Sequence, residues 1–337
     1  MGLGLAVGVV AAPMAGGGST PELVAAVGGA GGLGFLAAGY RTAAGMAEQI
    51  RATRALTDRP FGMNLFVPGP AADPAVVAAY RERLLPEARR WGVELPERVA
   101  EDRDDWEAKL AALVADPVAY VSYTFGLPSA AEAAQVRAAG TVQVGTVTSA
   151  AEAVAAAGRG MDALTVQGPE AGGHRGTHRA EDEPGSAPLL ELLAAVRRVT
   201  DLPLIAAGGL ADGPGIAAAL DAGAEAVQLG TAFLRSDESG ASPAHRRALL
   251  ELGETVVTRA FTGRPARGLR NAFIDRYQPY APTGYPEVHH LTQPLRAAAT
   301  RRADLDAMHL WAGTGHRLAR TGPAARLTRA LWAEAGR

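Results

Sequence analysis

The segment PLIAAGGLADGPGIAAALDAGAEAVQLGT, Pro203 to Thr231, contains one complete repeat of the predicted fold. An apolar run ends in Gly208-Gly209, a helical pattern starts near Gly213, and a second apolar run ends in Gly230-Thr231. Both runs are apolar throughout rather than alternating, so each predicts a strand that is covered on both faces. A strand, a helix and a second such strand predict a βαβ unit with parallel strands.

The same unit recurs along the chain, which carries eight apolar runs, most of them followed by a helical pattern. The runs are LAVGVVAAP (5–13), GFLAAG (34–39), FGMNLFV (61–67), VAYVSYTFG (118–126), TVQVGTV (141–147), ALTVQG (163–168), LPLIAAGG (202–209) and AVQLGT (226–231). Capping signals mark several helix starts: Thr20 before Pro21, Ser129 with Glu132, and Ser149 with Glu152. Eight units predict an α/β fold, a closed (β/α)8 TIM barrel. An open, doubly wound sheet is the alternative.

Two regions do not fit this repeat. Residues 70–117 are too long for one barrel helix and contain two charged helical patterns, at about 74–91 and 104–115. Residues 259–337 carry no strand pattern; the Pro- and Tyr-rich loop YQPYAPTGYP is followed by two or three helices. We therefore expect residues 1–69 and 118–258 to form the barrel. Residues 70–117 and 259–337 would form a second, smaller and mainly helical domain or cap.

Composition excludes several classes of function. The 337 residues carry a net charge of −2, which gives no general attraction to nucleic acid or to an anionic membrane. Cysteine is absent, so disulfides, thiolate catalysis and zinc–thiolate sites are excluded, and we predict no metal site. Lys109 is the only lysine. The apolar N-terminal run lacks the basic start of a signal peptide, because the first basic residue is Arg41. We expect a cytoplasmic protein, monomeric or homodimeric.

The strand ends of a TIM barrel carry its active site, and here they are rich in glycine. Gly208-Gly209 and Gly230-Thr231, at the ends of the last two strands, are typical of a phosphate site built from backbone N–H groups and a helix N-terminus. Asn64 and Gln167, at other strand ends, can both donate and accept hydrogen bonds, as the edge of a flavin ring requires. We predict FMN rather than FAD, because no adenosine-binding unit is visible. The GGAGGLG stretch (28–34) precedes a strand and fails the context of a dinucleotide fingerprint.

The loop QGPEAGGHRG, Gln167 to Gly176, follows the sixth apolar run. Gly172 and Gly173 would let the backbone pass close to a ring system, and His174 would project beside it. A neutral imidazole at this place is suited to remove a proton from carbon, and a protonated one to bind an anion. Arg175 would attract an anionic substrate or form an outward salt bridge. Glu170 would hydrogen-bond within the loop.

An ordered set of motifs resembles the nitronate monooxygenase (2-nitropropane dioxygenase) family, in particular its bacterial class I group. The set includes APMAGGGSTPELVAAVGGAGGLGF, FGMNLFVP, VSYTFGLPS, QVGTVTSAAEA, VQGPEAGGHRG, PLIAAGGLADG, AVQLGTAFL, LTQPLR and LWAGTG, and it spans nearly the whole chain. The resemblance implies an FMN-binding barrel with a second domain, and His174 as the active-site residue.

The residues expected at the site fall into two groups. The cofactor-binding group is Ala12, Pro13, Met14, Asn64, Gln167, Gly172, Gly173, Gly208, Gly209, Gln228, Leu229, Gly230 and Thr231. The group expected to line the substrate side is Ser122, Tyr123, Phe125 and Tyr285.

The resemblance implies an enzyme that oxidises alkyl nitronates, such as propionate 3-nitronate, with O2 to carbonyl compounds and oxidised nitrogen species. Three alternatives stay open. One is an FMN-dependent NAD(P)H reductase of quinones or enoyl thioesters, because related reductases also carry an AGGH-type loop. The second is a flavin-binding partner protein without turnover, and the third is a phosphosugar-type barrel enzyme without flavin.

Overall fold

The computed structural model describes residues 3–337 and contains a closed eight-stranded parallel barrel. The barrel strands are β1 (Val9–Ala11), β2 (Leu33–Ala37), β3 (Gly62–Phe66), β4 (Tyr120–Thr124), β5 (Val142–Val147), β6 (Ala163–Gln167), β8 (Leu204–Ala207) and β9 (Ala226–Leu229). β9 pairs with β1 through Val10 and Gln228, which closes the ring. The predicted (β/α)8 TIM barrel is therefore confirmed, with each of its strands inside or overlapping one predicted run.

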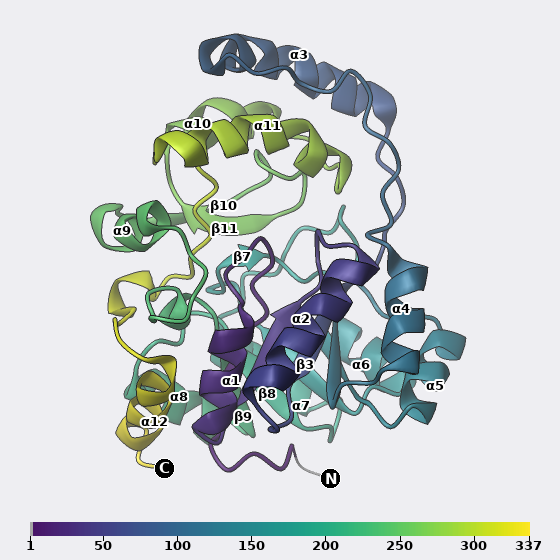
Figure 1. The fold of residues 1–337 in the computed structure, drawn as a ribbon, viewed down its shortest axis with the longest axis vertical. Helices are drawn as coiled ribbons and strands as arrows, with labels where there is room; N and C mark the ends of the chain where they lie inside the picture. Colours follow the sequence, from purple (N-terminus) through teal and green to yellow (C-terminus); the bar gives the residue numbers. More distant parts are fainter. Residues whose placement is uncertain (1–2) are drawn as a thin grey trace.

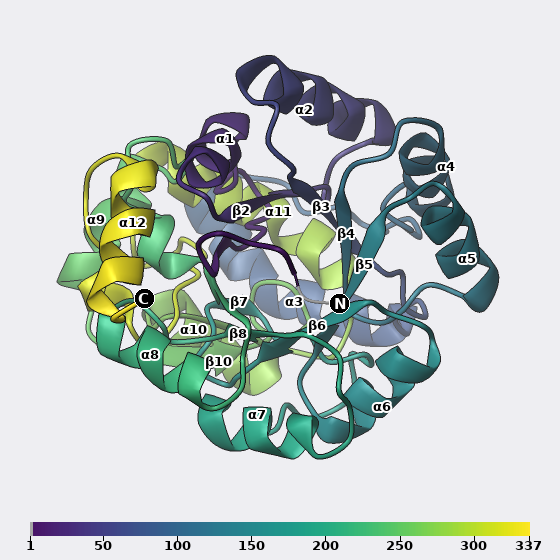
Figure 2. The ribbon, with the colours of Figure 1, turned by 90° about the horizontal axis from the view of Figure 1, so that it is seen from below.

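Helices surround the strands, as the view along the barrel in Figure 2 shows. They are α1 (Pro21–Gly29), α2 (Ala43–Leu56), α4 (Trp106–Ala115), α5 (Ala130–Ala138), α6 (Ala150–Gly158), α7 (Leu189–Arg197), α8 (Gly213–Asp221) and α12 (Ala324–Glu334). The Thr20 hydroxyl caps α1, and Ser129 with Glu132 forms the predicted capping box of α5. The predicted box at Ser149 is only half formed, because the Glu152 carboxylate accepts from Thr148 and from the N–H of His178 instead.

A second group of elements lies above the barrel in Figure 1. Its helices are α3 (Pro74–Trp91), α9 (Pro243–Glu251), α10 (Ala272–Tyr277) and α11 (Glu287–Arg302). Its three-stranded antiparallel sheet has the order β10 (Thr255–Thr258), β11 (Ala266–Leu269), β7 (Gly173–His174). Short 3-10 turns occur at Thr231–Phe233, Gln278–Tyr280 and His316–Leu318. The expectation that residues 259–337 contain no strand was wrong at β11, whose four residues are too few to give a clear pattern.

Several helices pack on a different part of the molecule from the one that the sequence suggested. The apolar faces of α4 (Trp106, Leu110) and α12 (Leu327, Leu331) belong to the barrel core, so α12, rather than α9, the first α-helix after β9, completes the ring. α9 instead packs into the core of the second group, together with α3 and α11. Helical periodicity shows that a helix has an apolar face but not which core covers it. The division of the chain into two domains stays a prediction.

Candidate active site

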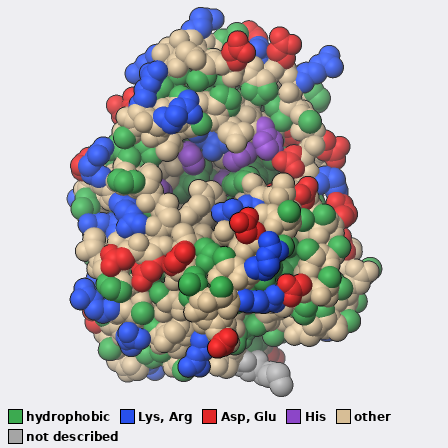
Figure 3. Space-filling view, viewed as in Figure 1, with side chains coloured by type: hydrophobic (Ala, Val, Ile, Leu, Met, Phe, Trp, Pro, Cys, Tyr) green, Lys and Arg blue, Asp and Glu red, His purple; other side chains and the backbone are tan. Residues whose placement is uncertain are grey.

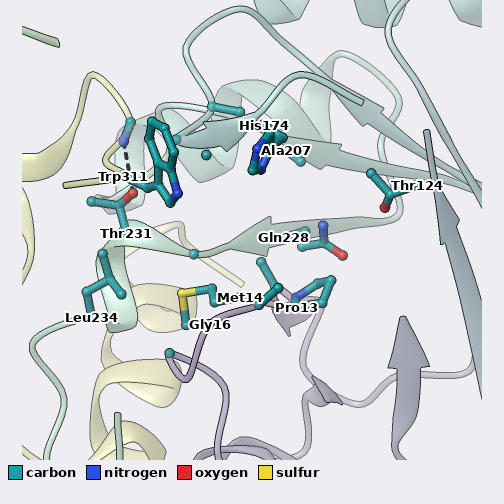
Figure 4. A pocket seen from close by; sticks show the side chains of 18 of the residues that line it. Pro13, Met14, Gly16, Thr124, His174, Ala207, Gln228, Thr231, Leu234 and Trp311 are labelled. Carbon is teal, nitrogen blue, oxygen red and sulfur yellow. Dashed lines mark hydrogen bonds between the residues drawn. The ribbon is translucent and has the colours of Figure 1, made fainter. Parts of the chain in front are cut away.

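A cavity of about 340 Å3 lies at the C-terminal ends of the barrel strands, between the barrel and the second group of elements. Its wall includes residues from the ends of β1, β3, β4, β6, β8 and β9, and from the segment 308–315. Figure 4 shows His174 and Trp311 on one side of this cavity, with Pro13 and Met14 across from them. Histidine side chains are visible in the hollow between the two parts of the molecule in Figure 3. This is the place where the sequence predicted an active site.

One end of the cavity is lined by the glycines that follow β8 and β9. Gly208 and Gly209 have φ angles of +130° and +70°, which an L side chain rarely adopts. The N–H groups of Gly209 and Gly230 donate to no other described residue. The Thr231 hydroxyl accepts from the N–H of Gly313 at 3.0 Å, which ties the segment 311–315 to this end. The arrangement leaves N–H donors directed to a ligand, as an anion site requires.

Three predicted side-chain amides reach the cavity in different ways. The Asn64 amide is held by β4, where its Nδ2 donates to Ser122 Oγ at 2.9 Å and to Thr124 Oγ1 at 3.0 Å. The backbone of Gln228 pairs within the barrel, but its side-chain amide makes no hydrogen bond with the described residues and is available to a ligand. The Gln167 amide is already used by its own loop, because Nε2 donates to the His174 carbonyl and Oε1 accepts from Gly176 N–H. Gln167 therefore shapes the loop as well as lining the cavity.

The loop that carries His174 is fixed from both sides. β7 pairs with β11, with His174 opposite Ala266. A side chain at Gly172 would place its Cβ 2.4 Å from the Gly313 nitrogen, so only glycine allows this approach. Arg175 is 1% exposed and donates to the carbonyls of Gly168 and Gln167. The outward salt bridge expected for Arg175 was wrong, because its guanidinium is buried and hydrogen-bonds to the start of its own loop. Its attraction of an anionic substrate stays a prediction.

His174 lines the cavity among aromatic rings. Its ring centroid lies 5.6 Å from that of Phe125, 5.7 Å from that of Tyr285 and 5.5 Å from that of Trp311. Its Nε2 lies 2.9 Å from the hydroxyl of Thr262. Burial, reinforced by the positive charges of Arg264 and Arg296, lowers the pKa of His174 to about 3. The imidazole is therefore neutral at physiological pH.

Two buried guanidinium groups face this region without a carboxylate partner in contact. Arg264 stacks on the Phe125 ring at 4.0 Å and donates to the Thr177 carbonyl. Arg296, on α11, donates to the carbonyl of His289 and to the hydroxyl of Thr292. Burial lowers the pKa of each guanidinium to about 10, so both keep their charge at neutral pH. Glu152 and Glu181 act on Arg264 only from a distance, so the two guanidinium groups give the site a positive charge that favours an anionic ligand.

The four residues expected on the substrate side lie in different places. Ser122 and Phe125 line the cavity, and Tyr285 contacts Phe125 and His174 but borders a second, neighbouring cavity. Tyr123 was predicted wrongly: it is fully buried between the barrel and its helices, with its hydroxyl 3.0 Å from Gln143 Oε1. Strand residues alternate between the two faces, so Ser122 and Thr124 point inward and Tyr123 points outward.

The predicted cofactor residues are mostly cavity residues. Those in the wall are Ala12, Pro13, Met14, Asn64, Gln167, Gly172, Gly173, Gly208, Gly209, Gln228, Gly230 and Thr231. Leu229 is the exception, because the same alternation turns its side chain into the core between strands and helices. Only the Leu229 backbone faces its neighbour strand, where its carbonyl accepts from Ala12 N–H.

Sequence reasoning missed several residues of this site. Trp311, Tyr40 and His309 line the cavity, and His245 lines it with Nε2 at 2.9 Å from the Trp311 carbonyl. Tyr40 stacks on His289 with centroids 4.0 Å apart. The LWAGTG motif was a usable signal for Trp311, whereas nothing in the local sequence of the others distinguishes a cavity residue from a core residue.

Comparisons with known proteins show the family to which this chain belongs. The family model for nitronate monooxygenase matches residues 3–334. A nitronate monooxygenase of Paraburkholderia phytofirmans is 42% identical, over 98% of this chain and 92% of that protein. A probable nitronate monooxygenase of Staphylococcus saprophyticus is 38% identical, over 92% of this chain and 89% of that protein.

Solved structures are similar as well. The crystal structure of nitroalkane oxidase from Streptomyces ansochromogenes is 51% identical, with a TM-score of 0.96 over 98% of this chain and 96% of that chain. FabK from Thermotoga maritima is 27% identical, with a TM-score of 0.75 over 98% of this chain and 93% of that chain. The chain therefore belongs to the nitronate monooxygenase family and is an oxidoreductase.

Residues 3–337 contain neither a membrane-spanning helix nor a cluster of metal-ligating side chains. No helix in this part of the chain is long and apolar enough to cross a membrane. No group of three or more histidine, aspartate or glutamate side chains there is placed to hold a metal ion.

Proposed function

We propose that this protein is an FMN-dependent nitronate monooxygenase that oxidises alkyl nitronates, such as propionate 3-nitronate, with O2. The products would be carbonyl compounds and oxidised nitrogen species. The observation that carries the proposal is the position of His174. It is a neutral imidazole in the wall of a cavity that has free N–H donors at one end, and two guanidinium groups with no carboxylate in contact among residues 3–337 lie nearby. Nitronates are anions, and a positive field of this kind favours them over neutral molecules.

The residues present fit FMN. The N–H groups of Gly209 and Gly230 have no partner among residues 3–337 and suit a phosphate, and the amides of Asn64 and Gln228 suit the polar edge of a flavin ring. A volume of about 340 Å3 lies within the usual range of cofactor and ligand sites. When bound, the flavin supplies the electron transfer.

The protein's own residues supply position and charge. Phe125 and Trp311 flank the imidazole and would limit the access of water to it. Phe125 itself has a φ of +78°, a strained conformation for a residue with a side chain, and such strain is concentrated at functional sites. Arg264 and Arg296 would attract the nitronate anion. His174, neutral at physiological pH, would accept a hydrogen bond or a proton rather than act as the cation that binds the nitronate.

The test begins with the visible spectrum of the purified protein, followed by anaerobic addition of propionate 3-nitronate. We expect a yellow protein whose flavin is reduced by the nitronate, and a His174→Ala variant that retains flavin but is reduced at least about 100-fold more slowly by a neutral nitroalkane. Reduction by NADH with no response to nitronates would favour the reductase alternative. A colourless protein that cannot be reconstituted with FMN would refute the flavin assignment, and a yellow one reduced by neither would favour the binding protein.

A further inference from the structure

Thr262 is the only described residue whose side chain hydrogen-bonds to the His174 ring. Thr262 is 1% exposed and lies in the turn that joins β10 to β11. The N–H groups of Thr262 and Gly263 both donate to the Arg259 carbonyl, which fixes the turn. Its Oγ1 is 2.9 Å from His174 Nε2 and 3.3 Å from the carbonyl oxygen of Arg264. The proposed function so far gives this threonine no role.

The direction of these two hydrogen bonds follows from counting protons. A carbonyl oxygen only accepts, and a threonine hydroxyl has one proton to donate. If the Thr262 hydroxyl donates to the Arg264 carbonyl, its oxygen accepts from Nε2–H of His174. Both contacts are then satisfied, whereas the reverse direction would leave the buried Arg264 carbonyl without this donor. The arrangement therefore selects the imidazole tautomer that carries its proton on Nε2.

The charges around His174 keep the imidazole in this singly protonated form. The charged groups that act on it are the guanidinium groups of Arg264 and Arg296, and the titratable neighbours are Tyr285, His289 and His309. Its other close neighbours are the rings of Phe125, Tyr285 and Trp311. A neutral imidazole with its proton on Nε2 has a lone pair on Nδ1. Nδ1 has no hydrogen-bond partner among residues 3–337, and His174 lines the cavity.

We propose that Thr262 is a positioning residue that fixes the Nε2–H tautomer of His174 and so makes Nδ1 the proton acceptor for neutral nitroalkanes. In this step the C–H bond next to the nitro group breaks. The proton goes to Nδ1, and the electron pair delocalises onto the nitro oxygens to give the nitronate. A nitronate supplied as substrate has already lost this proton. Flavin reduction by nitroalkanes therefore depends on Thr262, whereas reduction by nitronates does not. This inference rests on the proposed function.

The first experiment reads the tautomer directly. Nitrogen NMR of the flavin-loaded protein labelled with 15N-histidine distinguishes a protonated ring nitrogen from an unprotonated one, and a His174→Asn variant assigns the His174 signals. We expect Nε2 protonated and Nδ1 unprotonated at pH 7 in the wild type and in Thr262→Ser, and a mixed or reversed population in Thr262→Val. An Nδ1–H tautomer in the wild type would overturn the proposal, whatever the enzyme oxidises.

The second experiment compares flavin reduction by a nitroalkane with that by its own nitronate, measured anaerobically for each variant. Thr262→Val should slow reduction by the nitroalkane about 100-fold more than reduction by the nitronate, because loss of an oriented base costs about 10²- to 10⁴-fold. Thr262→Ser should restore most of the nitroalkane rate. Thr258→Val is the matched control, because it also removes a buried hydroxyl, one that bonds to Gln278 rather than to His174.

Equal losses with both substrates in Thr262→Val would show a merely structural role and refute the proposal. A wild-type nitroalkane rate in that variant would do the same. If neither compound reduces the flavin of the wild type, the proposed function fails. The NMR result then still decides whether Thr262 sets the tautomer, so the two failures are distinguishable.

Discussion

Acidification should destabilise this protein well above the pH at which most carboxylates titrate, because several of its histidines are buried in the neutral form. Burial, together with the charge of Arg296, lowers the pKa of His289 and of His309 well below the ordinary value of 6.5, and that of His174 to about 3. The unfolded chain binds these protons below about pH 6.5, whereas the folded chain does not. The stability that the neutral histidines contribute is therefore present above pH 6.5 and lost as the pH falls.

The size of the effect follows from proton linkage. Each such histidine removes about 1.4 kcal/mol of unfolding free energy per pH unit, or about 2 kcal/mol between pH 6.5 and pH 5. Three of them remove about 6 kcal/mol, which is comparable to the total stability of many domains. Asp104 acts in the opposite direction, because burial raises its pKa to about 6 and the folded state binds its proton first. It offsets about one histidine over this range.

The assay is urea unfolding followed by tryptophan fluorescence between pH 7 and pH 5, with His289→Gln as the test variant. His289 is 7% exposed, so its contribution is least affected by solvent. The variant should be less stable at pH 7, because it loses the stacking on Tyr40. Its stability should fall less steeply with acid, by about 1.4 kcal/mol per pH unit. Phe261→Leu, a non-titrating change in the neighbouring core, should keep the wild-type slope. Equal slopes for wild type and His289→Gln would refute the reasoning.

Three further changes test separate parts of the structure. Lys109→Met should lower the free energy of unfolding by about 3 kcal/mol in urea at pH 7, because it removes the ammonium group that lies 2.7 Å from the Asp104 carboxylate. An unchanged free energy would contradict the role of this buried pair. Gly209→Ala should lower the affinity for the flavin at least about 10-fold in an equilibrium titration. The added Cβ would lie 2.8 Å from a neighbouring atom, in a backbone conformation with φ of +70° that alanine rarely adopts. An unchanged affinity would exclude this residue from the cofactor site. Arg264→Met should raise KM for nitronates more than it lowers kcat and should raise the pKa of His174, measured by NMR titration; an unchanged KM would exclude Arg264 as a source of the attracting field.

The barrel could be predicted from the sequence because its signals are local. An apolar run such as Leu204–Ala207 and a cap such as Ser129 with Glu132 each depend on residues within a few positions. The packing partners of α4 and α12 could not be predicted in this way, since an apolar stripe does not specify its partner. The two-residue strand β7 exists only because β11, far along the chain, pairs with it.

The same distinction between local signals and tertiary packing applies to the candidate site. The glycines at 208, 209 and 172 were recognisable because a close backbone approach restricts the residue type. The inward or outward direction of Tyr123 and Leu229 depends on strand register, which the sequence left undetermined. Arg264 and Thr262 lie about 90 residues beyond His174, so their contact with its surroundings follows from tertiary structure alone.

The position of α12 has a consequence for how the protein forms during synthesis. α12 fills the place between α8 and α1, and the ring of Trp332 packs against Gly8, beside β1. A ribosome completes all eight barrel strands before it has made residues 324–334. Until then the apolar surfaces of α1 and α8 that α12 covers are exposed. The nascent chain therefore presents an apolar surface that is prone to aggregate until α12 packs on it. Residues 8–29 and residues 324–334 must therefore meet before the barrel is protected from aggregation.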